Sequence, residues 1–180
     1  MVTEKEKYLF DEVNKINPDF NKIGEIIKNG VNINIRNEHG ETLLMSAIDY
    51  INNIKWYDEN GNLAETGDES IELVQKTVPK IDISIIRYLL EMGVDPNIED
   101  NDGSRCLKEA VWTFRSDIFK LLLEYNAEIN FKVYGEEFFC DWILYELDEF
   151  KYDGNRIAES EISKMVEMIN EYKQDKRNCS

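Results

Sequence analysis

The sequence predicts an all-α fold, a solenoid of about four helix-turn-helix repeats. One sequence unit recurs along the chain, glycine and asparagine return at the same places within it, and the copies account for most of the 180 residues. Self-similarity at a fixed period of 20 to 50 residues indicates a repeat array, in which each unit buries its apolar face against its neighbours. We therefore expect a single, monomeric repeat domain over residues 1–180.

The repeat is defined by glycine and asparagine at fixed offsets. Without a gap, the first two copies align Gly30, Asn34 and Gly40 with Gly93, Asn97 and Gly103. The next copy begins 33 residues after Gly93, where asparagine can also adopt the left-handed conformation that ends a helix. Its following glycine, at 135, comes nine residues after Asn126 instead of ten, so this copy is expected to be one residue short.

A fourth unit follows from the last helix. Residues 163–173 (SKMVEMINEYK) match residues 116–126 (SDIFKLLLEYN) position by position. The predicted repeats are therefore 3–35, 36–98, 99–131 and 132–175. Apolar residues that recur at equivalent helical positions should form the shared core. They are Leu44, Ala47, Ile85, Leu89, Leu107, Ala110, Ile118, Leu122, Met165 and Ile169.

Two repeats contain insertions. Gly30 and Gly93 lie 63 residues apart, 30 more than the period, and the excess falls at about 52–81, where a short helix is expected to end near Thr77. With Trp142 placed at the position of Ala110, about 15 extra residues fall at 146–159. Both insertions should leave the array where the two helices of a repeat are joined. They could serve binding or be tolerated surface drift.

These residues resemble the ankyrin repeat, whose pattern runs D-x-x-G-x-T-P-L-H-x-A-A and later LL-x-x-G-A-D-V-N. Thr42, Leu44 and Ala47 fit the first part in one copy, as Leu107 and Ala110 do in the next. The departures are Leu43 and Cys106 in place of proline, and Met45 and Lys108 in place of histidine. The resemblance implies stacked helical hairpins joined by extended finger turns.

The resemblance also implies a protein-binding groove on the concave side, lined by the finger turns and the first helices. The second repeat would contribute Arg36, Glu38, His39, Glu41, Asp49 and Tyr50. The third would contribute Glu99, Asn101, Asp102, Ser104, Trp112 and Thr113, and the fourth Tyr134, Glu136, Leu144 and Tyr145. Trp112 and Tyr50 attract attention because aromatic residues dominate interface energetics. They could instead pack against a neighbouring helix.

Charge narrows the range of partners. The chain has 37 acidic and 21 basic residues, a formal net charge of −16. Such a surface repels nucleic acid and anionic membranes and attracts a basic protein, although acidity could merely keep the protein soluble. An odd set of cysteines (Cys106, Cys140 and Cys179) and the absence of an apolar export signal indicate reduced thiols and a cytoplasmic location.

No motif indicates catalysis, a cofactor or a metal. The sequence lacks the zinc-protease, P-loop, nucleophile-elbow and dinucleotide patterns. Its histidine, His39, is expected at an exposed turn tip. Asp100, Asp102, Gly103 and Glu109 imitate part of a calcium loop, but Ile98 occupies the first ligand position.

We therefore expect a non-enzymatic protein-binding module. Its net charge, small size and lack of an export signal make it similar to immunity proteins of toxin systems, and inhibition of a basic bacterial toxin is one form that the sequence permits. The alternatives are an effector or regulatory scaffold acting on a cellular protein and, third, an enzyme with a site formed by the insertions.

Overall fold

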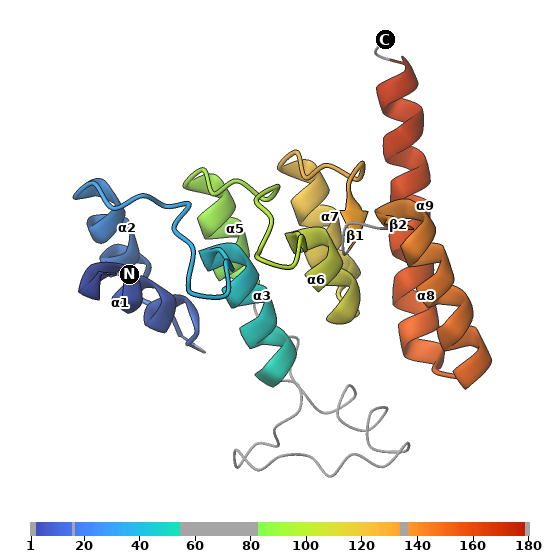
Figure 1. The fold of residues 1–180 in the computed structure, drawn as a ribbon, viewed down its shortest axis with the longest axis horizontal. Coiled ribbons are helices and arrows are strands. Elements are labelled where there is room, and N and C mark those ends of the chain that lie inside the picture. Colours follow the sequence, from blue (N-terminus) through green and yellow to red (C-terminus); the bar gives the residue numbers. More distant parts are fainter. Residues whose placement is uncertain (1–2, 16, 55–82, 134–136, 179–180) are drawn as a thin grey trace. The chain divides into compact units, whose positions relative to one another are not determined.

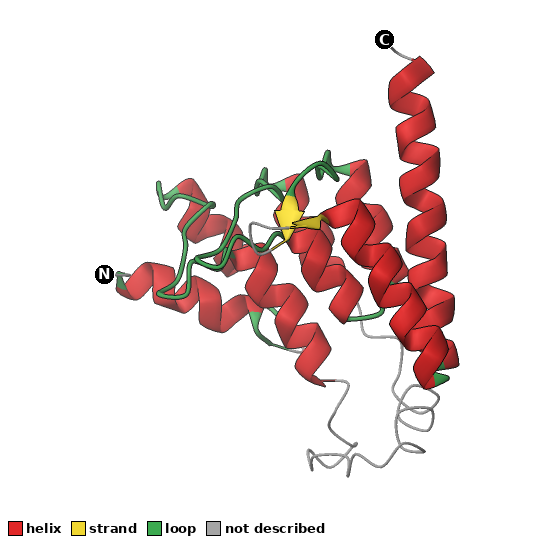
Figure 2. Ribbon diagram, turned by 45° about the vertical axis from the view of Figure 1, so that its right-hand side comes forward, coloured by secondary structure: helices red, strands yellow, loops and turns green. Residues whose placement is uncertain are grey.

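The computed structural model describes residues 3–15, 17–54, 83–133 and 137–178. The chain divides into two compact units, Met1–Val94 and Asp95–Ser180, and each is described by itself. Nearly all regular structure in the described ranges is helical (Figure 2). The all-α repeat prediction is therefore confirmed, while a single domain over the whole chain stays a prediction. The insertion predicted at 52–81 lies, apart from the end of one helix, outside the described residues.

The described residues of unit 1 form two helical hairpins (Figure 1). The helices in these residues are α1 (Glu4–Val13), α2 (Phe20–Lys28), α3 (Leu43–Ile54) and α5 (Ser84–Glu91). The first begins at a capping box, in which the Thr3 hydroxyl accepts from the Glu6 N–H and the Glu6 carboxylate accepts from the Thr3 N–H. Helix α1 contacts α2 and α3, and α3 contacts α5, so neighbouring hairpins share one core.

A buried carboxylate ties the first hairpin together. The Glu12 side chain on α1 accepts hydrogen bonds from Lys15 Nζ at 2.7 Å and from the Asp19 N–H at 2.8 Å. These hydrogen bonds, the Lys15 bond foremost, lower the pKa of Glu12 to about 2. The Glu12 side chain is therefore ionised at neutral pH, and its carboxylate holds the backbone at Asp19, where α2 begins.

Unit 2 contains two further hairpins and one short sheet. Its elements are α6 (Cys106–Trp112), α7 (Ser116–Glu124), β1 (Lys132–Val133), β2 (Glu137–Phe138), α8 (Phe139–Asp153) and α9 (Arg156–Asn178). The strands pair antiparallel, with Lys132 opposite Phe138 and Val133 opposite Glu137. Helix α9 packs against both α7 and α8, so the last helix closes the core of this unit.

The turns of the first two sequence copies have the same local structure. The oxygen of the Asn37 side chain accepts from the N–H groups two and four residues on, at 2.9 and 3.0 Å, and Asp100 does the same at 2.8 Å for both. Matching glycines have matching left-handed φ angles, 91° at Gly30 and Gly93, and 81° and 78° at Gly40 and Gly103. Asn126 takes the same role in the next copy with φ 64°. The turns are therefore equivalent.

The predicted core is confirmed. All ten side chains named from the sequence are buried, from Leu44 to Ile169. The periodic apolar face of each helix supplies them, and removal of this surface from water is the dominant favourable contribution to folding.

The register of the fourth repeat corrects the sequence interpretation. The pairing of Lys132 with Phe138 is equivalent to the bridge between Arg36 and Thr42, because the two residues of each pair are six positions apart. The turn of the fourth repeat therefore has its full length and is not one residue short. Ile143, and not Trp142, therefore takes the place of Ala110, and both are buried. The glycine at 135 misled the alignment because it stands one position earlier in the sequence than the period requires.

The second insertion is helical. Helix α8 continues to Asp153, where α6 stops after seven residues, and α9 begins at Arg156, well before the position of Ser163 that matches the start of α7. Gly154 ends α8 in the left-handed conformation. The extra residues of 146–159 thus lengthen both helices of the hairpin, whereas the sequence interpretation placed them in the turn.

Candidate protein-binding surface

The first helices of the two repeats in unit 2 carry exposed aromatic side chains. Trp112 at the end of α6 is 41% exposed, and Tyr145, one period later on α8, is 56% exposed. The Trp112 ring lies 6.2 Å from the ring of Trp142, which is buried one helical turn before Tyr145. On α8, Tyr145, Glu146 and Glu149 lie on the same side of the helix as Trp142, and with Trp112 they define a surface that we name the α6–α8 face.

Carboxylates surround the aromatic residues of this face. Glu149 is the main cause of a raised pKa at Tyr145, because its negative charge disfavours the phenolate, and Glu146 and Glu137 act in the same direction. Burial and the charge of Glu149 raise the pKa of Glu146 above its ordinary value. Tyr145 therefore lies in a negative potential, which a positive ligand would relieve.

A lysine inside unit 2 offsets only part of this negative charge, because the positive charge of Lys108 lowers the pKa of Glu146 by less than burial and Glu149 raise it. Lys108 is buried on α6, its ammonium group donates to the Ser104 hydroxyl at 2.8 Å, and Glu109 lies 3.8 Å away. The sequence alignment placed this lysine where Met45 stands in the preceding repeat. The structure shows that its ammonium group hydrogen-bonds within its own repeat.

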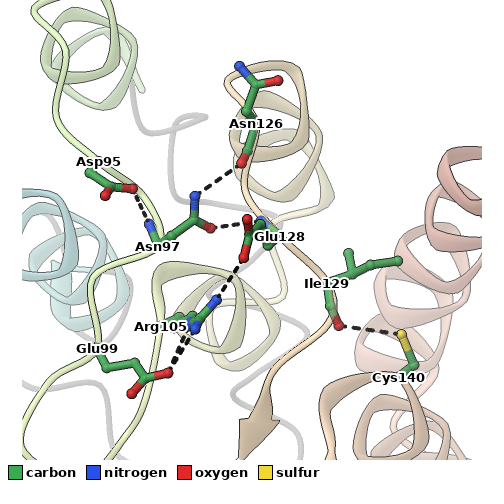
Figure 3. A network of polar contacts seen from close by, with 8 residues as sticks. All are labelled: Asp95, Asn97, Glu99, Arg105, Asn126, Glu128, Ile129 and Cys140. Atoms are coloured by element: carbon green, nitrogen blue, oxygen red, sulfur yellow. Dashed lines mark hydrogen bonds and ion pairs between the residues drawn. The ribbon is translucent and has the colours of Figure 1, made fainter. Parts of the chain in front are cut away.

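The finger turns of unit 2 are joined by a polar network (Figure 3). The Asn97 side chain donates to the Asn126 carbonyl at 3.1 Å and accepts from the Glu128 N–H at 2.8 Å. Arg105 pairs with Glu99 at 2.8 Å and with Glu128 at 3.5 Å (Figure 3). Glu99, predicted as a binding residue, is therefore already paired within the protein.

Arg105 is also held by an aromatic ring. Its guanidinium lies 4.9 Å from the centre of the Phe131 ring, which is buried. The neighbouring residues Asn101 and Asp102, both predicted as binding residues, are exposed at the tip of the turn. The turn of this repeat therefore presents a polar, acidic tip on a fixed base.

In unit 1 the predicted residues occupy the corresponding turn and helix. Glu38 and His39 are exposed at the tip, and Arg36 Nε donates to the Gly40 carbonyl at 2.8 Å. Glu41 is half-buried and accepts from the Asn37 side chain at 2.6 Å. On α3, Asp49 is exposed and Tyr50 is half-buried.

Two predicted binding residues are unavailable to a partner. Ser104 and Thr113 are both buried, and the Thr113 hydroxyl donates to the Ala110 carbonyl at 2.8 Å. Tyr134 and Glu136 lie outside the described residues. With the register corrected, Tyr145 and Glu146 occupy the positions that match Trp112 and Thr113.

Sequence reasoning missed the exposed residues of the longer α8. Tyr152 is 90% exposed, and Asp148 and Glu149 are also exposed. The signal was present in the apolar residues Phe139, Ile143, Leu147 and Phe150, whose spacing of three and four residues continues the helix past the predicted break.

Two kinds of feature are absent from the described ranges. No group of three or more histidine, cysteine, aspartate or glutamate residues there could hold a metal ion. None of the helices in those ranges combines the length and apolar character that crossing a membrane requires.

Comparisons with known proteins agree with an ankyrin-like fold. No protein-family model matches the sequence. An ankyrin repeat protein of Acanthamoeba polyphaga mimivirus is 43% identical over 42 residues, 23% of this chain and 10% of that protein. In a solved complex of a predatory endopeptidase from Bdellovibrio bacteriovorus with an immunity protein, one chain matches with a TM-score of 0.50 and 17% identity, covering 90% of this chain and 63% of that one. The chain thus spans only part of both proteins. The first match is to an ankyrin repeat sequence, and the second shows a shared fold.

Proposed function

We propose that this protein is a non-enzymatic binding module that holds a basic protein partner through the α6–α8 face and the adjacent finger turns. The observation that carries the proposal is the exposure of Trp112 and Tyr145 at equivalent positions of successive first helices. Large aromatic side chains that remain exposed on a packed scaffold are typical anchors of protein interfaces.

The charge of this face favours a basic partner. Glu146 and Glu149 lie beside Tyr145, and their charges contribute to its raised pKa, which indicates a negative potential at the centre of the face. With a net charge of −16, the whole chain would also accelerate encounter with a positive protein. The aromatic anchors would supply affinity, and the carboxylates would select the partner by charge.

Inhibition of a toxin is the specific form that we favour. The solved complex that contains a similar fold pairs a peptidase with an immunity protein, and an acidic inhibitor suits a basic toxin such as a nuclease. A cytoplasmic location fits this role. An effector or regulatory scaffold would use the same face, but with weaker, more salt-dependent binding.

The first test identifies the partner by affinity purification from the native cell and then measures its dissociation constant. We expect Trp112→Ala and Tyr145→Ala each to weaken binding by a factor of about 30, the loss of a hot-spot side chain of about 2 kcal/mol. Tyr125→Ala, at the end of α7, is the control and should bind normally. Circular dichroism checks that all three variants are folded.

Equal retention of the partner by wild type and both face variants would contradict the proposal. Salt then separates the two binding roles, because a specific inhibitor should keep most of its affinity at 0.5 M salt and a loose scaffold should not. Catalytic turnover lost on deletion of residues 52–81, with the fold intact, would favour the third alternative, an enzyme.

A further inference from the structure

The part of α8 that exceeds the repeat is held rigidly against the preceding hairpin. Phe150 in the added turns meets Phe114 edge to face, with ring centres 5.1 Å apart and planes at 88°. Phe114 adopts a left-handed φ of 51° in the turn between α6 and α7, a conformation that a bulky residue takes only where packing stabilises it. The extension is therefore anchored at its base by an aromatic pair.

A second anchor comes from α9. The Glu161 carboxylate accepts from the Ser116 hydroxyl at 2.6 Å and from the Ser116 N–H at 3.2 Å, at the first turn of α7. Burial opposes ionisation of Glu161, but hydrogen bonds from Lys164 and Ser116 outweigh it and lower its pKa. The ionised carboxylate thus caps α7 from another helix and fixes the lengthened hairpin to it.

The opposite side of α8 presents a stripe of alternating carboxylates and phenols. Its members are Asp141, Tyr145, Asp148 and Tyr152, at successive spacings of four, three and four residues, and all are exposed. On an α-helix these positions fall within about 60° of arc and extend about 16 Å along the axis. We name them the α8 stripe. Leu144 and Glu149 flank it, and Leu144 is 47% exposed.

One of the two carboxylates of the stripe has a cationic partner on α8. Lys151 pairs with Asp148 at 3.3 Å through an exposed contact, and among the described residues no other ion pair involves α8. Glu149, Glu146 and Glu137 add to the negative potential at Tyr145, which its raised pKa reflects. A face that is both aromatic and negative is complementary to arginine, whose guanidinium can stack on a phenol and pair with a carboxylate one turn away.

We propose that the α8 stripe docks an arginine-bearing helix of the partner protein, with arginines seven residues apart seated on Asp141 with Tyr145 and on Asp148 with Tyr152. This inference rests on the proposed function and specifies the partner's contact surface. Seven residues on a helix advance about 10 Å, the same as the separation of the two aspartates along α8. Charge complementarity and matched spacing therefore identify the occupant.

The test uses two synthetic helical peptides with alanine-rich backbones and identical composition. One carries its arginines seven residues apart on one face, and the other distributes them around the helix. Fluorescence anisotropy with the full-length protein should give about tenfold tighter binding of the aligned peptide. The double variant Tyr145→Ser/Tyr152→Ser and the variant Asp148→Lys should each abolish that preference. The control Tyr125→Ser/Glu124→Lys, on α7, should keep it.

Equal binding of the two peptides to wild type, no binding of either, or an equal loss in the α7 control would overturn the inference. Binding of the natural partner by the variants distinguishes a failure of this inference from a failure of the proposed function. If Trp112→Ala loses the partner while the Tyr152→Ser/Asp148→Lys variant binds it normally, the stripe is wrong and the proposed function stands. If instead the Trp112→Ala and Tyr145→Ala variants both bind the natural partner normally, the proposed function itself is wrong.

Discussion

The hydroxyl of Tyr88 on α5 lies against Gly24 on α2, which has no side chain, and this contact gives the sharpest test of the packing in unit 1. The Tyr88 hydroxyl donates to the Phe20 carbonyl at 2.9 Å, and its ring stacks on the Phe20 ring at 4.9 Å. A Cβ placed on Gly24 would lie 2.6 Å from that hydroxyl oxygen and 3.9 Å from the ring carbon that bears it. Glycine at 24 therefore makes room for the hydroxyl alone.

The effect of Gly24→Ala can be worked out from this geometry. Alanine favours the helix by about 1 kcal/mol over glycine, but the clash displaces the hydroxyl and strains the contact, at a cost of about 2 kcal/mol. The net loss of stability should be about 1 kcal/mol. Tyr88→Phe alone loses one hydrogen bond, also about 1 kcal/mol.

The double variant Gly24→Ala/Tyr88→Phe should be as stable as wild type. Without the hydroxyl, the new methyl group meets only the ring at van der Waals distance, and the helix gain offsets the lost hydrogen bond. The single changes therefore add to about 2 kcal/mol and the double change to about zero, a coupling of about 2 kcal/mol. Urea unfolding of the four proteins, followed by circular dichroism, measures it. Additive effects would refute the proposed packing.

Three further predictions concern other contacts. Glu12→Gln should destabilise the protein by about 1–2 kcal/mol at pH 7, because it removes charge-assisted hydrogen bonds. Since the folded pKa of Glu12 is lowered to about 2 from 4.5, this difference should be present above pH 4.5 and shrink as the pH falls toward 2, as urea titrations at several pH values would show. Asn97→Ala should cost about 1–3 kcal/mol and reduce hydrogen-exchange protection at the Glu128 amide, whereas Asn130→Ala at an exposed site should change neither. Glu161→Gln should weaken the cap on Ser116 and lower stability by about 1 kcal/mol, and unchanged unfolding curves would contradict the second anchor.

The regular parts of the fold could be predicted because each repeat uses the same few residue types for the same physical purpose. Glycine or asparagine is needed where φ is positive, as at Gly93 and Asn126, and apolar residues are needed where helices meet, as at Leu107 and Ile118. These requirements are local and periodic. A single sequence displays them directly.

The last repeat was harder because its signals conflict. Its glycine at 135 favoured a short turn, whereas strand pairing of Lys132 with Phe138 sets the true register. The extension of α8 carries no glycine or proline before Gly154, so nothing interrupts the helix, but a comparison based on the period alone assigns the surplus residues to a turn.

The exposure of the candidate binding residues could be predicted only in part. Trp112 and Tyr145 are exposed as expected, but Ser104 and Thr113 are buried, because their hydroxyls take part in hydrogen bonds with Lys108 and with the Ala110 carbonyl. A family pattern gives the position of a residue in the repeat. It does not reveal whether a small polar side chain is buried and hydrogen-bonded within the protein or is exposed to a partner.

The hydrogen bonds of the Asn97 side chain have a consequence for the evolution of this repeat array. Both partners of this side chain are backbone groups, the carbonyl of Asn126 and the N–H of Glu128, so these two bonds do not depend on which side chains the following repeat carries. The contacts of Arg105 with Glu128 and Phe131 do depend on them. Exchange of the following repeat would therefore keep the Asn97 bonds but would require a matching residue at position 105.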